Sequence, residues 1–286
     1  MKKIMKKILS VTGIMILILS CRGPRGPEGP QGPQGPEGPT NIYVMSFLFS
    51  SIDTSIAEAY VSFSPSIPNV KINNINIPFR EVWGNTFYFY KRGITTILPG
   101  SDANLEVTYI KADNSQGEAN ASVKVPGIFA ITSHDTSQPV SIPLGSSFTV
   151  TWSSSQNANF YFVSFYLEYM YVDTAGEDKY FYCEKDTMIT QNFIIFPSSF
   201  LFPNLNEIDS IMWSWGWFEV DAVSGPQIKE GEKGNVTGDG FGFFWGIIYG
   251  GDLGLYVEGG KFISRKETQS YEKLKEFLKN KAEKIR

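Results

Sequence analysis

From residue 41 onward, apolar and polar side chains alternate in short runs separated by proline, glycine, asparagine and serine. Successive side chains of a strand point to opposite faces, so a period of two with one polar face predicts a half-buried strand. Runs of this kind and shorter β-prone runs lie at 43–49, 57–63, 70–77, 86–90, 105–109 and 118–125. We expect residues 41–127 to form an antiparallel β-sandwich that ends at Pro126-Gly127.

A second run of strands follows this dipeptide and predicts a second sandwich over 128–264. Phe148, Val150 and Trp152 share one strand face, and a Ser/Asn-rich loop leads to the next strand at Tyr161. This arrangement resembles the B–C region of fibronectin type III and related immunoglobulin-like domains. Ile97-Leu98-Pro99-Gly100 resembles their E–F corner, although the tyrosine usual at that corner is missing. The resemblance implies a fold and says nothing of a ligand.

The C-terminal part changes character twice. Glycines interleaved with aromatic residues are frequent beyond Gly225, and we expect extra strands that close the second sheet. Tyr271, Leu274, Leu278 and Ile285 then recur at helical spacing, which predicts an amphipathic helical tail over 265–286. The predicted fold class is therefore all-β, with two tandem sandwiches and a short C-terminal helix.

The N-terminus has the features of an export signal. Four lysines precede a twelve-residue apolar run at 8–19, which is too short to span a bilayer as a helix. The sequence Ile18-Leu19-Ser20-Cys21 resembles the lipobox of bacterial lipoproteins. This resemblance implies a signal peptide over 1–20, acylation of Cys21 and tethering to a membrane by lipid. Arg22 in place of aspartate favours the outer membrane or cell surface, while the side of the membrane stays open.

Residues 23–40 are six unbroken Gly-Pro-Y triplets. The run resembles the collagen-like repeats of some bacterial surface proteins, and its composition favours polyproline II. With the lipidated cysteine it forms a predicted spacer over 21–40. As a stalk, the repeat would reach about 55 Å. The alternative is a triple helix that makes the protein a homotrimer, helped by three lipid anchors in one membrane.

Charge and residue usage exclude several classes of function. The chain carries a formal charge of −4 with a basic tail, so its body is acidic and nucleic acid is not expected as a partner. His134 is the only histidine, which closes histidine-based catalysis and His-rich metal sites. Cys183 has no partner once Cys21 is acylated, and we expect a buried, inert thiol. No cofactor is expected, and Asp239 and Asp252 in glycine-rich turns are weak calcium candidates.

The most specific candidate site is Trp213-Ser-Trp215-Gly-Trp217. Strand parity places the three indoles on one face, followed there by Glu219 and Asp221, while Met212, Phe218, Val220 and Ala222 form the opposite, core face. If the strand at 161–171 is the neighbour, Phe162, Tyr166 and Glu168 lie beside the tryptophans. Three alternatives follow: the glycine-rich stretch or the C-terminal helix covers these rings, the rings offer a glycan-binding face, or they offer a protein interface.

These observations lead to one functional hypothesis and one alternative. The first is a lipid-anchored cell-envelope protein with a structural, adhesive or interaction role, which presents β-sandwich modules on a collagen-like stalk. The alternative is a carbohydrate-binding surface lipoprotein that uses the aromatic strand face. No nucleophile–base pair is recognisable, and Glu219 and Asp221 on one strand do not straddle a substrate as a glycosidase pair does. We expect no enzymatic activity.

Overall fold

A computed structural model describes residues 41–229, 232–262 and 270–284, which are mainly strand. The strands before Pro126 are β1 (Ile42–Ser50), β2 (Ser55–Ser62), β3 (Asn69–Ile72), β4 (Ile75–Ile77), β5 (Phe79–Trp83), β6 (Thr86–Ile94), β7 (Asp102–Ile110) and β8 (Gln116–Lys124). The later strands are β9 (Val140–Ile142), β10 (Phe148–Thr151), β11 (Phe160–Asp173), β12 (Asp178–Ile189), β13 (Phe193–Phe196), β14 (Ile208–Ser224), β15 (Thr237–Gly238), β16 (Gly240–Val257) and β17 (Lys261–Phe262). The predicted signal peptide, Cys21 and the Gly-Pro-Y spacer lie outside the described residues.

The described helices are α2 (Ser198–Leu201), the 3-10 turn η1 (Leu205–Glu207) and α3 (Ser270–Lys284). The all-β class with a short C-terminal helix is thus confirmed. The turns α2 and η1, between β13 and β14, were not predicted. None of the helices in the described ranges has the length and apolar character needed to cross a membrane.

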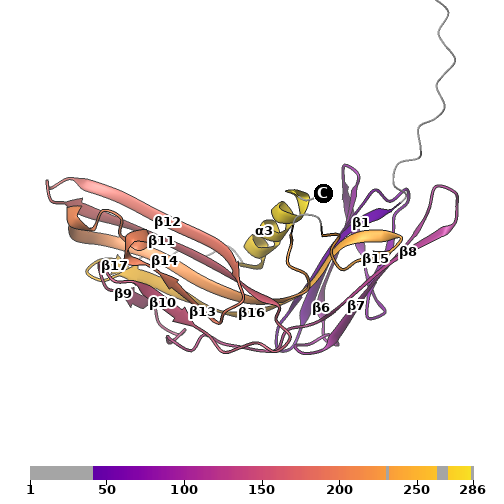
Figure 1. Ribbon diagram of the computed structural model, residues 1–286, viewed down its shortest axis with the longest axis horizontal. Helices are drawn as coiled ribbons and strands as arrows, with labels where there is room; N and C mark the ends of the chain where they lie inside the picture. The colour runs from indigo at the N-terminus through magenta and orange to yellow at the C-terminus, as the bar shows by residue number, and fades with distance from the viewer. Residues whose placement is uncertain (1–40, 230–231, 263–269, 285–286) are drawn as a thin grey trace, which may run out of the picture. The chain divides into compact units, whose positions relative to one another are not determined.

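Within the described residues the strands form three sheets. The large sheet has the order β12-β11-β14-β16-β1-β2-β6-β5, with β17 beside β14 and β9 beside β16 (Figure 1). The small sheet has the order β15-β8-β7-β3-β4, and β10 pairs with β13 alone. Most neighbours are antiparallel, as predicted; β1 and β16 are a long parallel pair, and β17 and β9 are short strands parallel to β14 and β16.

The strand β16 joins the two halves of the large sheet. Its first part pairs with β1, from Ile42↔Gly240 to Ser50↔Ile248. Its second part pairs with β14, as in Gly216↔Leu255. The glycine-rich stretch therefore does supply extra strands, and it contributes them to both halves of the sheet. The limits 41–127 and 128–264 for two separate sandwiches stay a prediction.

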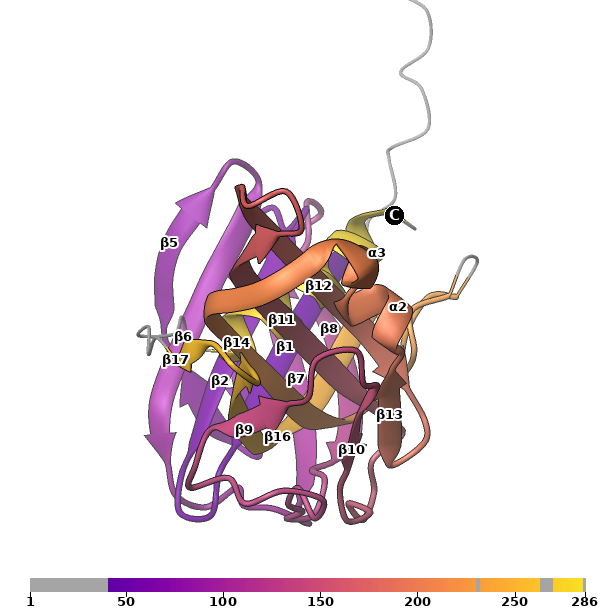
Figure 2. The same cartoon turned by 90° about the vertical axis from the view of Figure 1, so that its left-hand side faces the viewer.

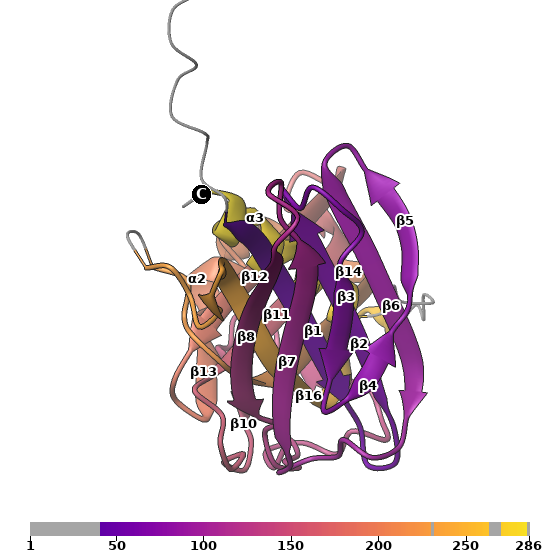
Figure 3. The same ribbon diagram turned by 90° about the vertical axis from the view of Figure 1, so that its right-hand side faces the viewer.

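One face of the large sheet is covered by the other strands. The small sheet packs over β1, β2 and β6 (Figure 3), and the β10–β13 pair with α2 packs over β11 and β14 (Figure 2). Apolar side chains from these layers form one buried core, which includes Trp152, Phe196 and Phe218. Trp152 lies 5.5 Å from Tyr161 and 6.2 Å from Phe218, measured between ring centroids. The alternation of apolar and polar side chains predicted this layered packing.

The opposite face of the large sheet is covered in part by α3 (Figure 1). Leu274, Leu278 and Ala282 of the helix have no solvent exposure. They pack in a second buried cluster with side chains of the sheet, among them Tyr43, Phe47, Tyr60, Phe162, Val223, Phe243 and Trp245. The sequence predicted this amphipathic helix but not the surface that it covers.

The second cluster corrects the expectation that 57–63 is a half-buried strand. Glu58 and Tyr60 on the supposed polar face are 2% and 4% exposed. Burial of Glu58 is offset because Lys275 of α3 lies 3.2 Å from its carboxylate and Tyr60 donates a 3.0 Å hydrogen bond to it. Phe63, expected inside, is 48% exposed, since the strand ends before it and its φ is +66°. The run 70–77 is two strands joined by an Asn73-Asn74 turn with positive φ angles.

Candidate aromatic binding face

The strand β14 carries the three tryptophans on the face opposite the main core. Phe218, Val220 and Ala222 point into that core with no solvent exposure, as predicted. Met212 was expected there as well, but it is 42% exposed. The reason is a bulge: Met170 pairs with Trp213 and Tyr171 with Ile211, so Met212 has no partner in the register.

The register places the predicted neighbours beside the tryptophans. In the pairing of β11 with β14, Tyr166 lies opposite Trp217 and Glu168 opposite Trp215. Phe162 lies opposite Asp221 in the same ladder. The neighbouring strand and its face are thus those predicted from the sequence.

The contribution of β12, the strand on the other side of β11, was not predicted. Tyr180 lies opposite Met170 and Tyr182 opposite Glu168, on the same face as the tryptophans. Both tyrosines are more than half exposed, at 55% and 57%. Cys183 was correctly expected to be buried, and its parity alone would have placed Tyr182 and Tyr180 outward.

Five of these rings form a contiguous surface, which we call the aromatic platform: Tyr166, Tyr180, Tyr182, Trp213 and Trp215. Neighbouring ring centroids are 5.3 Å apart for Tyr166–Trp215, 6.2 Å for Tyr180–Trp213, and 6.4 Å for Tyr166–Tyr182 and Tyr180–Tyr182. Trp213, Trp215 and Tyr166 are half-buried. The platform is therefore a packed aromatic surface that is partly exposed.

A carboxylate lies beneath the platform. Glu168 is only 2% exposed, and its Oε2 accepts a 2.8 Å hydrogen bond from the Tyr166 hydroxyl and a second one from the Tyr180 hydroxyl. Burial and the hydrogen bond to Glu168 raise the pKa of Tyr166 above its ordinary value. The hydroxyl therefore remains a donor at neutral pH, and the carboxylate is fixed in place by the rings that surround it.

The helix α3 covers the other candidates of this face. Trp217 is 6% exposed, and the Lys273 Nζ lies 3.9 Å from its ring centroid. Phe162 is 2% exposed and packs against Phe277, with their ring centroids 5.0 Å apart. Either the glycine-rich stretch or the C-terminal helix was expected to cover these rings, and the helix is the element that does so. The helix does not cover the aromatic platform.

Glu219 and Asp221 lie beside the covered region and are 4% and 3% exposed. Burial raises the pKa of Asp221 to about 8. Asp252 pairs with Glu219 in the register and accepts a hydrogen bond from Tyr249, whose pKa is raised by burial and by these neighbouring carboxylates. Glu219, Asp221 and Asp252 thus form an acidic patch in which Glu219 and Asp221 are buried and Asp252 is exposed.

We expect Asp221→Asn to flatten the pH dependence of stability. The folded-state pKa of Asp221 is raised above the unfolded value, so the folded chain holds a proton that the unfolded chain releases. Stability contributed by this group is therefore lost as pH rises from about 4 to about 8, by at most about 1.4 kcal/mol per pH unit. Denaturant unfolding at a series of pH values measures the slope. The exposed Asp209→Asn is the matched control, and equal slopes in both variants would contradict the assignment.

The calcium candidates lie in two different environments. Asp239 accepts a 2.9 Å hydrogen bond from Lys111 and one from the backbone N–H of Glu118, and both hold its pKa below the ordinary value. Asp252 interacts with Tyr249 as described above. Across the described ranges, no group of three or more His, Cys, Asp or Glu side chains is arranged to hold a metal ion. The calcium role of Asp239 and Asp252 stays a prediction.

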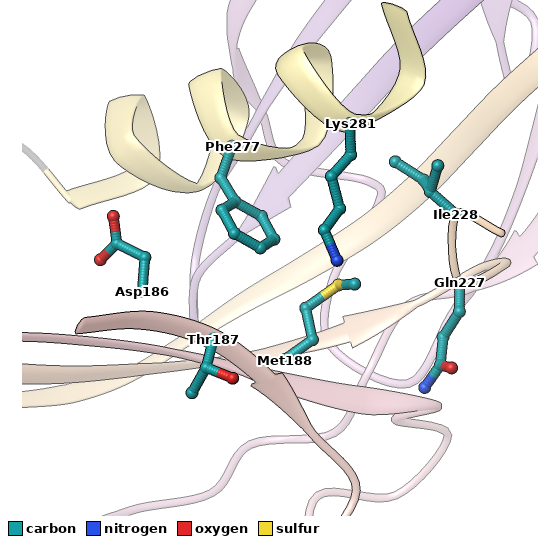
Figure 4. Close-up of a pocket in the computed structure, with 7 residues that line it drawn as sticks. All are labelled: Asp186, Thr187, Met188, Gln227, Ile228, Phe277 and Lys281. Carbon is teal, nitrogen blue, oxygen red and sulfur yellow. The ribbon is translucent and has the colours of Figure 1, made fainter. Parts of the chain in front are cut away.

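Two further features lie outside the platform. A cavity of ≈430 Å³ opens between α3 and β12, with Lys281 and Phe277 on the helix side and Asp186 and Met188 on the strand side (Figure 4). No local pattern in the sequence indicates this cavity, because the helix and the strand are far apart in the chain. Burial raises the pKa of the Cys183 thiol to about 12, which keeps it protonated and unreactive.

Comparisons with known proteins add little to this description. No family model matches the chain, and no curated protein matches it. Among solved structures, "DIP-gamma IG1+IG2" matches with 6% sequence identity over 79% of this chain and 99% of that chain, at a TM-score of 0.20. "Dpr11 IG1 bound to DIP-gamma IG+IG2" matches with 8% identity over 71% of this chain and 98% of that chain, at a TM-score of 0.19. The immunoglobulin or fibronectin type III identity of the modules therefore stays a prediction.

Proposed function

We propose that this chain is a lipid-anchored cell-envelope protein that binds a partner through the aromatic platform. The observation that carries the proposal is the set of five packed aromatic rings on β11, β12 and β14, outside the area that α3 covers. Large aromatic side chains that remain accessible on a folded domain mark binding surfaces more often than chance. Tyrosine and tryptophan also combine a large apolar ring with a polar group, which suits recognition.

The anchoring part of the proposal comes from the sequence. The lipobox-like Ile18-Leu19-Ser20-Cys21 would attach acyl chains, and two or more such chains hold a protein stably on a membrane. The six Gly-Pro-Y triplets would then hold the β-rich part away from the surface, as a single stalk or as a trimer. The outer membrane or the cell surface is the proposed location.

We expect Cys21→Ser to release or mislocalise the protein. The tether depends on one thiol, so the variant should lose incorporation of labelled palmitate and shift from the membrane fraction to the soluble fraction. Cys183→Ser is the matched control, because it removes the other cysteine and should change neither result. Unchanged labelling in the Cys21 variant would show that the lipoprotein assignment is wrong.

The proposal includes the absence of enzymatic activity. Glu219 and Asp221 are the carboxylates nearest to the platform on β14, but they are buried and lie two residues apart on one strand, as members of the acidic patch. A hydrolytic pair needs carboxyl groups on both sides of the bond that is cleaved. These two side chains do not offer that arrangement.

A carbohydrate ligand is the second candidate, favoured by the exposure of Tyr180 and Tyr182. Sugar rings stack on accessible aromatic faces, and each contributing ring is worth roughly 1 kcal/mol or more. We expect Tyr182→Ala to weaken binding of the full chain to its ligand at least fivefold with little change in melting temperature. Phe193→Ala is the control, since Phe193 is 46% exposed on β13 and away from the platform. A glycan array and a panel of envelope proteins distinguish the two ligand classes, and equal binding by both variants would contradict the platform assignment.

A further inference from the structure

The cavity between α3 and β12 has the composition of a small-molecule site. Its volume is ≈430 Å³. Small ligands typically bind in cavities of roughly 300–1,000 Å³, where apolar walls carry a few polar groups. The lining here combines both kinds of side chain: Met188, Ile228 and Phe277 with Asp186, Gln227 and Lys281. None of these residues belongs to the aromatic platform, so the cavity is a candidate site that does not depend on the proposed function.

The walls of the cavity are held in place by contacts outside it. On the helix side, Phe277 packs on Phe162 of β11, with the ring centroids 5.0 Å apart. The segment that follows β14 forms another wall, where the carbonyl of Pro226 accepts a 2.9 Å hydrogen bond from the Trp245 indole N–H. Ile228 of this segment is 9% exposed and packs in the second buried cluster. The cavity is therefore formed before a ligand enters, which lowers the entropic cost of binding.

Two opposite charges line the cavity from different elements. Asp186 lies on β12, and its Oδ1 accepts a hydrogen bond from the Ser164 hydroxyl, which orients the carboxylate. Lys281 lies on α3, and its Nζ is 5.0 Å from the centroid of the Phe277 ring. Within the described ranges, neither Asp186 nor Lys281 takes part in an ion pair. Both charges can therefore pair with groups of a ligand.

An apolar surface separates the two charges. Figure 4 shows the Phe277 ring between Asp186 and Lys281, with Met188 pointing from the strand toward the helix. Gln227 lies on the side of Lys281 that is away from Asp186, and its amide offers a donor and an acceptor there. A ligand that contacts all of these groups has a positive end, an apolar middle and a negative end.

We propose that this cavity binds a small zwitterion whose ammonium and carboxylate groups lie at opposite ends of an apolar chain. The ammonium pairs with Asp186, the carboxylate pairs with Lys281 and the Gln227 amide, and the chain contacts Phe277 and Met188. Asp186 is exposed and Lys281 is half-buried, so each ion pair is screened in part by water. The affinity therefore falls as the salt concentration rises.

The site exists only while α3 is docked on the sheet, because Phe277 and Lys281 both come from this helix. A ligand that binds the docked state and not the undocked state shifts the equilibrium toward docking. Binding in the cavity should therefore slow amide hydrogen exchange over 270–284. A ligand bound elsewhere on the chain would not have this effect on the helix.

The test compares 6-aminohexanoic acid with hexanoic acid and hexylamine, each of which lacks one of the two charges. Shorter and longer ω-amino acids, from 4-aminobutanoic to 8-aminooctanoic acid, cover the possible distances between the charges. The full chain, in a polyoxyethylene detergent, is titrated with each compound in a calorimeter, and hydrogen exchange over 270–284 is followed. We expect the best ω-amino acid to bind about fivefold more tightly than either singly charged compound. It should also slow exchange in the helix.

Two variants assign the charges to the two ends of the ligand. Lys281→Met keeps an apolar chain in place and should reduce the affinity for the ω-amino acid to that for hexylamine. Asp186→Asn keeps the shape of the side chain and should reduce it to that for hexanoic acid. Lys284→Met and Glu184→Gln make the same changes of charge at exposed positions outside the cavity. These two controls should change the affinity less than about twofold.

Each other outcome overturns the inference in a distinguishable way. Hexanoic acid that binds as tightly as the ω-amino acids would indicate an anion site, and hexylamine that does so would indicate a cation site. Equal binding of all the compounds would show a merely apolar cavity. Binding that survives both cavity variants would lie elsewhere on the chain, and no binding of any compound would show that the cavity is not a zwitterion site. None of these results affects the aromatic platform, which is tested separately by Tyr182→Ala.

Discussion

Leu278→Asp is expected to undock α3 from the large sheet. Leu278 has no solvent exposure and packs with Trp245, Phe47 and other rings of the second cluster. Truncating such a leucine costs about 2–5 kcal/mol, and a carboxylate placed there adds the cost of burying an unpaired charge. The helix follows the last strand and contributes no strand to the sheet, so it can leave the sheet without unfolding it. The loss is therefore limited to the free energy of docking.

The undocked state would expose a large part of the aromatic face. Glu58 would lose its contact with Lys275, and the rings under the helix would become accessible to water. We expect dye binding to exposed apolar surface, faster proteolysis at 270–284 and self-association, with the strand content of the circular dichroism spectrum retained. Asn280→Asp makes the same acidic side chain on the exposed side of the helix and should leave all three readings unchanged. A Leu278→Asp chain that resembles this control would show that α3 does not hold the cluster together.

The parts of the site that could be predicted are those that follow from local strand and helix geometry. Parity along β14 separated Trp213, Trp215 and Trp217 from Phe218 and Val220, because side chains of a strand alternate regardless of the fold. The same rule oriented Phe162 and Tyr166 once the neighbouring strand was identified. The helical spacing of Leu274 and Leu278 predicted α3 for an equally local reason.

Long-range pairing explains what could not be predicted. Nothing near β1 indicates that its parallel partner is β16, almost two hundred residues later in the chain. The burial of Glu58 and Tyr60 depends on α3, which is distant in the sequence, so their strand appeared half-exposed. The bulge at Met212 interrupted the alternation by one residue, which no composition signal revealed. The role of Tyr180 and Tyr182 likewise depends on the register of β12 with β11.

Trp217→Ala is expected to cost much more stability than Trp215→Ala. Trp217 is 6% exposed beneath Lys273, and removal of a buried indole costs about 3–5 kcal/mol. Trp215 and Trp213 are half-buried outside the helix, so their removal should cost about half of this or less. Denaturant unfolding of the three variants, followed by circular dichroism, gives the comparison. Similar losses of stability in all three variants would mean that Trp213 and Trp215 are as deeply buried as Trp217.

Lys273→Met separates the two ways in which α3 stabilises Trp217. Methionine retains an apolar chain over the ring but removes the charge that lies 3.9 Å from the ring centroid. A cation–π contact at such a partly buried site contributes roughly 0.5–2 kcal/mol. We expect a loss in this range, smaller than that of Trp217→Ala and reduced in Trp217→Leu, where no indole is present to attract the cation. A loss that is the same with and without the indole would assign the stabilisation to packing of the helix.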